Sequence, residues 1–493
     1  DALTSIGESA FSDCTSLTAI NIPANVSTIG VSAFSGCTAL SSITFSSGSN
    51  LSTLNDNVFK SCPITKILIP ASVATISTSA FASCVALTDV DFEGGCLLSI
   101  MDRYFGDCPI AKVKIPANVT KITCNAFHAK TTLTDVIFEK GSKCKEIEGK
   151  YGDSMSIDYH PYYSPYNDNA CGAFCLTRIE SIEIPASVEI IGPNAFRATS
   201  LKNVSFDTNS KLKVLTSQGL GSRDVVYYPI GTEYIESGMK KFSSSYSEPE
   251  GAFSQCIFTD IILPKSLEYI GPETFACSSV ISVSFEEGSL LKEIGELSFA
   301  NSAITSIAIP AKVYRIAGAA FHNCTSLFTI EFDKLSALET IEYSLYNHSP
   351  NDRAQLNGAF YGCTALTSIT LPASLTEIAK YSFYGCTALK TIKFSENATL
   401  ATIGDYGFYD CPVLHTVDMS NCNQVTKIGE SAFKSSDEMR LFKIGTVVPP
   451  TCGSTPFGAV GNYSVLKVPD GAVTQYQSAS GWKDFASITG LNE

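Results

Sequence analysis

The sequence predicts an α/β-type repeat solenoid: a right-handed superhelix, mostly strand and irregular structure, with a parallel β-sheet on its concave side. One observation is a 24-residue phrase, IPANVSTIGVSAFSGCTALSSITF at 22–45, which returns as LPASLTEIAKYSFYGCTALKTIKF at 371–394. A unit this short cannot bury its own apolar face, so about seventeen units are expected to stack around one core. The other observation is a phenylalanine that mostly recurs every 22 to 25 residues: Phe11, Phe34, Phe59, Phe81, Phe105, Phe127, Phe174, Phe196, Phe253, Phe275, Phe299, Phe321, Phe360, Phe383, Phe408, Phe433 and Phe457.

Each unit contains an L-x-x-I-x-I/F string that predicts a short strand. In the string of Leu40, Ile43 and Phe45, the last two apolar residues stand two apart, so both point inward while Thr44 faces outward. Equivalent strands are expected to pair into one continuous parallel sheet. The outward positions mix charge and size without an aromatic stripe, which favours a solvated face: Asn21, Thr44, Asp91, Lys114, Glu183, Ser205, Ala308, Glu331, Thr370 and Lys393.

Two alternating forms follow the strand. One is I-P-x-x-V-x-x-I, as in IPASVATI at 69–76, and the other is F-x-x-G-S-x-L-x-x-I, as in FEEGSLLKEI at 285–294. Proline cannot donate to the strand ladder, and glycine supplies a turn conformation that other residues disfavour, so both forms end the strand at one place. The chain then returns through the repeat phenylalanine, which fills the interior, and a turn such as GCTALT.

Ten of the 18 cysteines stand three residues after the repeat phenylalanine: Cys14, Cys37, Cys62, Cys84, Cys108, Cys256, Cys324, Cys363, Cys386 and Cys411. Other units carry Thr199, Ser278, Ser302 or Ser436 there, which indicates a small, weakly polar buried residue rather than a disulfide partner. We therefore expect at least ten free thiols. Stacked neighbours would lie within the distance that a disulfide allows, so geometry does not exclude some disulfides. Cys171 and Cys175 are the expected exceptions to the free thiols, because they stand off this ladder.

Composition and motifs argue against several functions. The chain has 48 acidic and 34 basic side chains, net −14, without a Lys/Arg-rich run, so nucleic acid and anionic membrane surfaces are not expected partners. H-E-x-x-H, G-x-S-x-G and P-loop patterns and paired zinc-type cysteines are absent from the sequence. His128 and His322 directly follow a repeat phenylalanine and are interpreted as turn residues. The sequence thus predicts no enzyme, catalytic residue, metal or cofactor, with a scattered carboxylate pair left open.

The pattern L-x-x-I-x-I-P…V-x-x-I-x-x-x-A-F-x-x-C resembles the BspA-like, Treponema-type class of leucine-rich repeats over nearly the whole chain. The tail resembles the C-terminal end of bacterial members and predicts a cap, with a last strand at 465–468 and a short helix holding Trp482. We expect a solenoid over 1–445 and the last repeat and cap over 446–493. The resemblance implies a secreted or surface-attached protein of a host-associated microbe, acting in adhesion.

Three insertions interrupt the repeat, at about 148–170, 216–250 and 342–357, each leaving at the same point after the F-x-x-G-S form. They hold 11 of the 21 tyrosines and each is net negative. Tyrosine offers large contact area at low entropy cost, so a ligand is expected on this lateral edge rather than on the concave strands. The predicted contact residues are Tyr159, Tyr162, Tyr163, Tyr166, Tyr227, Tyr228, Tyr234, Tyr343 and Tyr346.

Several alternatives stay open for these insertions. Their tyrosines could instead pack onto the solenoid flank. If they are exposed, they could bind a protein of a host matrix or cell surface, or stack on the sugar rings of a glycan. A catalytic domain hidden in the insertions is a third hypothesis. The sequence favours a monomer that binds protein, without membrane insertion; the signal peptide or anchor that an exported protein needs is not present in this chain.

Overall fold

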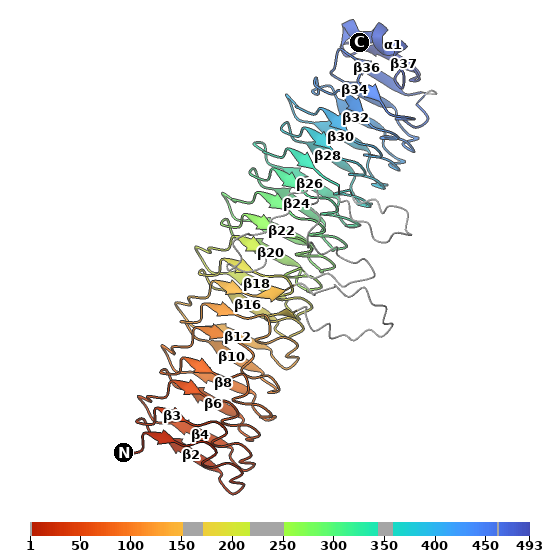
Figure 1. Cartoon of the computed structure of the whole chain (residues 1–493). Helices are drawn as coiled ribbons and strands as arrows, with labels where there is room; N and C mark the ends of the chain where they lie inside the picture. Colours follow the sequence, from red (N-terminus) through yellow and green to blue (C-terminus); the bar gives the residue numbers. More distant parts are fainter. Residues whose placement is uncertain (1, 151–170, 217–250, 344–357, 461–462) are drawn as a thin grey trace, which may run out of the picture. The chain divides into compact units, whose positions relative to one another are not determined.

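The computed structural model describes residues 2–150, 171–216, 251–343, 358–460 and 463–493 (Figure 1). The chain divides into two compact units, Asp1–Tyr227 with Ala252–Phe258, and Tyr228–Gly251 with Thr259–Glu493. Each unit is built of stacked turns in which a four-residue strand is followed by a two-residue strand. Helix is confined, among the described residues, to η1 (Asp470–Ala472) and α1 (Val473–Ser478). The predicted parallel repeat solenoid is confirmed in both units.

The strands of the first unit fall into two series. The four-residue strands are β2 (Ala19–Ile22), β4 (Ser42–Phe45), β6 (Lys66–Ile69), β8 (Asp89–Phe92), β10 (Lys112–Ile115), β12 (Asp135–Phe138), β16 (Ser181–Ile184) and β18 (Asn203–Phe206). The two-residue strands of the stack are β1 (Ser5–Ile6), β3 (Thr28–Ile29), β5 (Thr53–Leu54), β7 (Thr75–Ile76), β9 (Ile100–Met101), β11 (Lys121–Ile122), β13 (Glu146–Ile147), β17 (Ile190–Ile191) and β19 (Val214–Leu215). Two further strands of this length, β14 (Gly149–Lys150) and β15 (Cys171–Gly172), belong to neither series.

The second unit continues both series. Its four-residue strands are β20 (Asp260–Leu263), β22 (Ser282–Phe285), β24 (Ser306–Ile309), β26 (Thr329–Phe332), β28 (Ser368–Leu371), β30 (Thr391–Phe394), β32 (Thr416–Met419), β34 (Leu441–Ile444), β36 (Val465–Val468) and β37 (Ser487–Gly490). Its two-residue strands are β21 (Tyr269–Ile270), β23 (Glu293–Ile294), β25 (Arg315–Ile316), β27 (Thr340–Ile341), β29 (Glu377–Ile378), β31 (Thr402–Ile403), β33 (Lys427–Ile428) and β35 (Thr451–Cys452).

The repeat phenylalanines form the core, as predicted. From Phe34 onward they are buried, and in most pairs of successive turns the rings stack with centroids 4.9 to 5.8 Å apart. Phe11, in the first turn, is 36% exposed and stacks on Phe34. Offset stacking of this kind adds to the area that each ring buries, so the aromatic column holds consecutive turns together.

The four-residue strands do not pair as one continuous sheet, contrary to the sequence prediction. A four-residue strand that is followed by proline pairs over all four residues with the next such strand when that strand ends in phenylalanine, as in β2–β4 and β24–β26. Pairs in the opposite order are shorter or missing: β8–β10 and β22–β24 pair over two residues. The strands β4 and β6, β12 and β16, and β26 and β28 do not pair.

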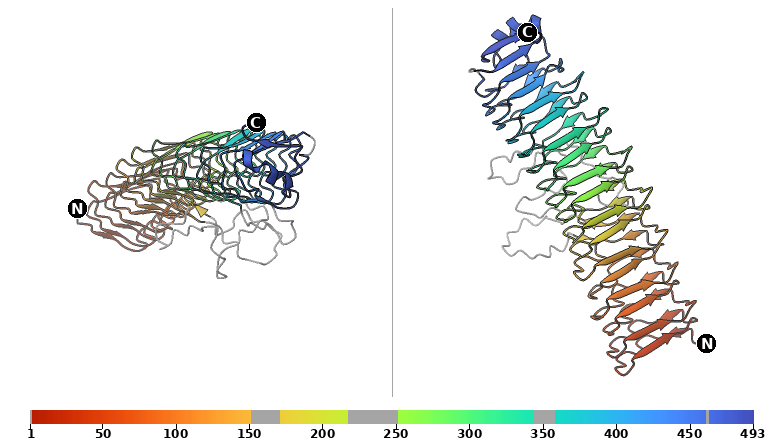
Figure 2. Two further views of the ribbon diagram at one scale, coloured as in Figure 1. Left: turned by 90° about the horizontal axis from the view of Figure 1, so that it is seen from above. Right: turned by 180° about the vertical axis from the view of Figure 1, so that it is seen from behind.

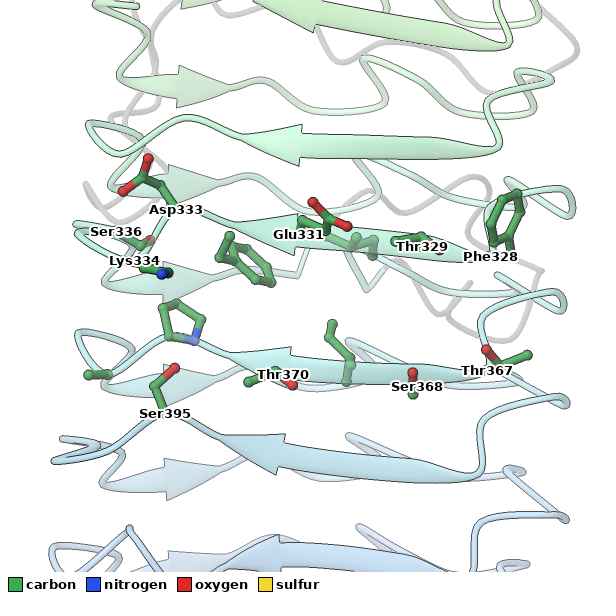
Figure 3. A pocket seen from close by; sticks show the side chains of 15 residues that line it. Phe328, Thr329, Glu331, Asp333, Lys334, Ser336, Thr367, Ser368, Thr370 and Ser395 are labelled. Carbon is green, nitrogen blue, oxygen red and sulfur yellow. The ribbon is translucent and has the colours of Figure 1, made fainter. Parts of the chain in front are cut away.

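Proline accounts for these breaks. In a full pair, the residue after the strand donates its N–H to the last strand carbonyl of the preceding turn, as Ser46 does to Ile22 and Glu93 to Ile69, both at 2.9 Å. In the opposite order the equivalent residue is a proline, such as Pro70, which has no N–H to donate. Between β26 and β28 the break opens a groove of about 470 Å³, in which Glu331 and Thr370 project from facing strands (Figure 3).

The ladder cysteines are free thiols, as predicted, and nearly all are buried. Nine of the ten donate their S–H to the carbonyl of the repeat phenylalanine in the turn before their own. Examples are Cys84 to Phe59 at 3.0 Å and Cys324 to Phe299 at 3.0 Å. Of the two expected exceptions, Cys171 forms a disulfide with Cys124, whereas Cys175 is a free buried thiol. The ladder position therefore links consecutive turns by hydrogen bonds.

The C-terminal turns differ in two details from the sequence prediction. The predicted strand at 465–468 is β36, but a further strand, β37, pairs with it in parallel. Trp482 follows α1 instead of lying in it, because the chain becomes extended at Ala479. The buried indole N–H donates to the carbonyl of Pro450 at 2.9 Å, and the ring packs edge-on against Phe442. The tryptophan thus closes the apolar end of the stack.

Candidate interaction surface

The three predicted insertions each follow a strand of the same two-residue series. The chain departs directly after the two-residue strands β13, β19 and β27. At the first insertion, Gly149–Lys150 (β14) pairs antiparallel with Cys171–Gly172 (β15). At the third, Tyr343 and Gly358 form an isolated antiparallel bridge. The base of each of these two insertions is therefore a short antiparallel pair that brings its ends together.

A glycine marks the return of every insertion. A Cβ atom on Gly172, Gly251 or Gly358 would lie 1.9 Å from a backbone carbonyl oxygen of the next turn. No side chain fits at that distance, so the returning chain presses its backbone against its neighbour. The sequence GAF that follows each insertion is thus a packing requirement.

A paired carboxylate stands at the exit of the first and third insertions. Glu148 directly follows β13, receives an ion pair from Lys121 at 3.2 Å, and accepts a hydrogen bond from the N–H of Cys124. Glu342 follows β27 and binds the Arg315 guanidinium through both carboxylate oxygens, at 2.9 and 2.8 Å. In both places a cation from the preceding turn anchors the exit.

Most of the predicted tyrosine contacts lie outside the described residues. This holds for Tyr159, Tyr162, Tyr163, Tyr166, Tyr227, Tyr228, Tyr234 and Tyr346. The remaining one, Tyr343, is half-buried at the base of the third insertion. The assignment of these nine residues to a ligand stays a prediction.

A second group of tyrosines, which was not predicted from the sequence, begins three residues after the third insertion returns. Tyr361, Tyr384 and Tyr409 each directly follow a repeat phenylalanine and stack in a column, with centroids 5.1 and 5.0 Å apart. His322 stacks on Tyr361 at 4.9 Å. We call these four residues the aromatic ladder. The recurring string FYG, FYG, FYD was the signal that could have revealed it.

The aromatic ladder is half-buried, and inside the stack each ring face is covered by the neighbouring ring. Interplanar angles of 11° to 15° show that the stacked rings cover one another. Burial raises the pKa of Tyr361 above its ordinary value, and the nearby Asp410 carboxylate raises it further. Burial likewise raises the pKa of Tyr384. These two phenols therefore stay protonated near neutral pH and can donate hydrogen bonds from adjacent turns.

Two more tyrosines widen this surface. Tyr381 and Tyr406 stack at 5.2 Å, and the Tyr406 hydroxyl donates to Glu430 at 3.3 Å. Asp405 lies beside them, paired with Lys380 at 3.1 Å. The surface thus combines tyrosines with the carboxylates Asp405 and Glu430. Among the described residues, Asp405 is paired with a lysine, whereas Glu430 accepts a hydrogen bond from a tyrosine.

The described residues hold no group of His, Cys, Asp or Glu that could bind a metal ion. His128 and His322 both lie in turns, as expected from the sequence. Within the described ranges, no helix is long and apolar enough to cross a bilayer.

The fold and this repeat pattern define a leucine-rich-repeat solenoid. The family model for the BspA type leucine rich repeat region, which comprises six copies of the repeat, matches residues 4–148, 170–247, 246–352 and 356–470. The chain belongs to this family, which confirms the resemblance seen in the sequence.

Solved structures similar to this chain include a bacterial antigen and two bacterial leucine-rich-repeat proteins. The pneumococcal vaccine antigen PcpA is 18% identical, with 90% of this chain and 85% of that chain covered and a TM-score of 0.38. A leucine-rich repeat protein from Bacteroides ovatus is 18% identical, with 90% and 82% covered and a TM-score of 0.31. A leucine rich cell surface protein from Faecalibacterium prausnitzii is 18% identical, with 80% and 83% covered and a TM-score of 0.28. A comparison with curated proteins found no match.

Proposed function

We propose that this chain is a non-enzymatic, extracellular or cell-surface binding protein that mediates adhesion to a protein of a host or neighbouring cell. Membership of the BspA type family supports a protein-binding role. The observation that carries the proposal is the aromatic ladder, because tyrosines in a row beside carboxylates are not needed to close the core. The insertion tyrosines predicted from the sequence are proposed as further contacts.

The geometry of the ladder favours a protein over a glycan. Sugar rings stack on exposed aromatic faces, and here each face between neighbouring turns is covered by the next ring. Protein segments instead use tyrosine edges and hydroxyls together with apolar contact area. The carboxylates Asp405, Asp410 and Glu430 favour a partner with a basic or mixed surface.

Replacing Tyr361, Tyr384 and Tyr409 together by serine is expected to weaken binding to such a partner by about tenfold or more, since clustered tyrosines carry much of an interface's energy. The partner would first be selected from a panel of matrix and cell-surface proteins, with a glycan array in parallel, and affinities measured by biolayer interferometry. The triple Tyr→Phe variant keeps the stack and removes only the hydroxyls, so an intermediate loss is expected.

The matched control replaces Phe328 and Tyr463, exposed aromatic residues away from the ladder, by serine. It should leave the affinity unchanged. Serine replacement of the nine insertion tyrosines tests their separate contribution. Unchanged binding by both the ladder and the insertion variants would contradict the proposal, and binding to glycans alone would favour the carbohydrate alternative.

A further inference from the structure

Basic side chains line up on the strand face of the last turns. Lys393, Asp418, Lys443 and Lys467 stand in register on the adjacent strands β30, β32, β34 and β36. These strands lie side by side in one sheet (blue in Figure 2, right). Each of the four residues occupies the outward position between two buried neighbours. Three cations therefore share one row with a single carboxylate.

A second basic row runs beside the first, at the start of the same strands. The N–H of His415 donates to the carbonyl of Lys390 at 3.1 Å, and the N–H of Arg440 donates to His415 at 3.0 Å, so the three residues occupy equivalent places in consecutive turns. The Arg440 guanidinium lies over the Tyr463 ring, 5.3 Å from its centroid. We call both rows together the basic face.

The cations of the basic face are poorly neutralised by the fold. Asp418 binds Lys443 at 2.9 Å and also accepts from Ser420. Lys393 and Lys467 make no ion pair with any described residue. Like charges on neighbouring strands repel each other, so the in-register pair of Lys443 and Lys467 costs stability. The arrangement is the more unusual because the chain is net −14.

Other carboxylates in this part of the chain stand off the strands. Glu396, Asp437 and Glu438 lie in turns before or after them, and Asp470 begins η1, where it interacts electrostatically with Lys467 without forming an ion pair. Between the two basic rows, the outward Thr391 and Thr416 add hydroxyls in register. The strand face of these turns thus offers cations and hydroxyls together.

We propose that the basic face binds an acidic polysaccharide. The rows follow the stacking direction, with about 4.8 Å between strands and about 10 Å between rows, which suits a linear polymer with repeated anionic groups. Lysine and arginine pair with sulfate or carboxylate, and the threonines can bond sugar hydroxyls. Single-stranded nucleic acid needs ring faces on which to stack its bases, and the Tyr463 face carries Arg440.

The test measures binding of the whole chain to heparin, hyaluronate, neutral dextran and an oligo-dT strand at low salt. We expect heparin or hyaluronate to bind, with affinity that falls as salt rises because exposed charges are screened. Stronger binding of heparin would identify sulfate as the preferred group, and stronger binding of hyaluronate would identify carboxylate. Failure of both to bind, or tighter binding of oligo-dT, would overturn the proposal.

Variants of the basic face locate the site. Lys393→Gln with Lys467→Gln should weaken binding by about tenfold, and this pair leaves the Lys443–Asp418 bridge in place. Asp418→Asn should strengthen binding, because it removes the only carboxylate of the row. The matched control, Lys112→Gln with Lys114→Gln, removes two lysines from strand β10 and should change nothing. An equal loss in the control, or no gain in Asp418→Asn, would contradict the assignment.

This inference is independent of the proposed protein partner. The serine variant of the aromatic ladder should bind the polysaccharide with unchanged affinity. The basic-face variant should in turn keep its affinity for a protein bound at the ladder.

Discussion

Replacing Arg315 by methionine is expected to lower the free energy of unfolding by about 3 to 5 kcal/mol, the usual cost of leaving a buried charge without its partner. Arg315 is 9% exposed and lies between Glu293, bonded at 2.9 Å, and the bidentate Glu342. Tyr314 also donates its hydroxyl to Glu293. Removing the guanidinium would leave two carboxylates facing each other with little access to water.

Urea unfolding followed by circular dichroism measures this effect. The variant that also carries Glu293→Gln and Glu342→Gln should recover much of the lost stability, since no unpaired charge then remains. Lys121→Met is the matched control in the first unit: Lys121 bridges Glu146 and Glu148 but its side chain is 34% exposed, so a smaller loss is expected. A loss below about 1 kcal/mol for Arg315→Met would show that water or rearrangement compensates the carboxylates.

Raising the pH from 8 to 10 is expected to destabilise the protein through its buried ladder thiols. Burial raises the pKa of Cys256, Cys324 and Cys386 to about 12. In the unfolded chain these thiols ionise near pH 9, whereas the folded state keeps them protonated. Stability from these groups is therefore complete below pH 9 and is lost as the pH rises toward 12, by about 1.4 kcal/mol per thiol at pH 10.

The three thiols together predict a loss of about 4 kcal/mol at pH 10. The matched variant replaces all three by serine, which occurs naturally at the equivalent positions Ser278 and Ser302. Its unfolding free energy should fall less steeply between pH 8 and 10 than that of the unmodified chain, whatever its stability at pH 8. The same slope in both proteins would mean that the ladder thiols do not govern alkaline unfolding.

Local patterns in the sequence were sufficient to predict the repeat unit. The inward and outward positions of each strand follow from alternation, and the stacked phenylalanines follow from their period. The free ladder thiols were predicted because Ser and Thr substitute for Cys at that place. The FYG and FYD strings also signal the aromatic ladder, because each places a tyrosine directly after a repeat phenylalanine.

Features that depend on the register between turns could not be predicted from one repeat at a time. The bond of Arg315 to Glu342 spans 27 residues, and Lys393 meets Asp418 only because β30 and β32 pair at that register. The breaks between the four-residue strands could not be predicted from one repeat either. They depend on which residue of one turn lies opposite the last strand carbonyl of the turn before it, and at the breaks that residue is a proline without an N–H. The helix expected to hold Trp482 ends at Ser478, and the indole packs instead against the apolar end of the stack.

The sequence by itself determined the family and the parallel solenoid, because these follow from spacing within a single unit. Only the tertiary structure decided which side chains of different turns meet, and so where charge and aromatic rings gather. The physical reason is that a repeat specifies its own inward face, whereas the surface is assembled from one residue per turn. The aromatic ladder and the basic face, the two surfaces proposed to bind ligands, arise at that second level.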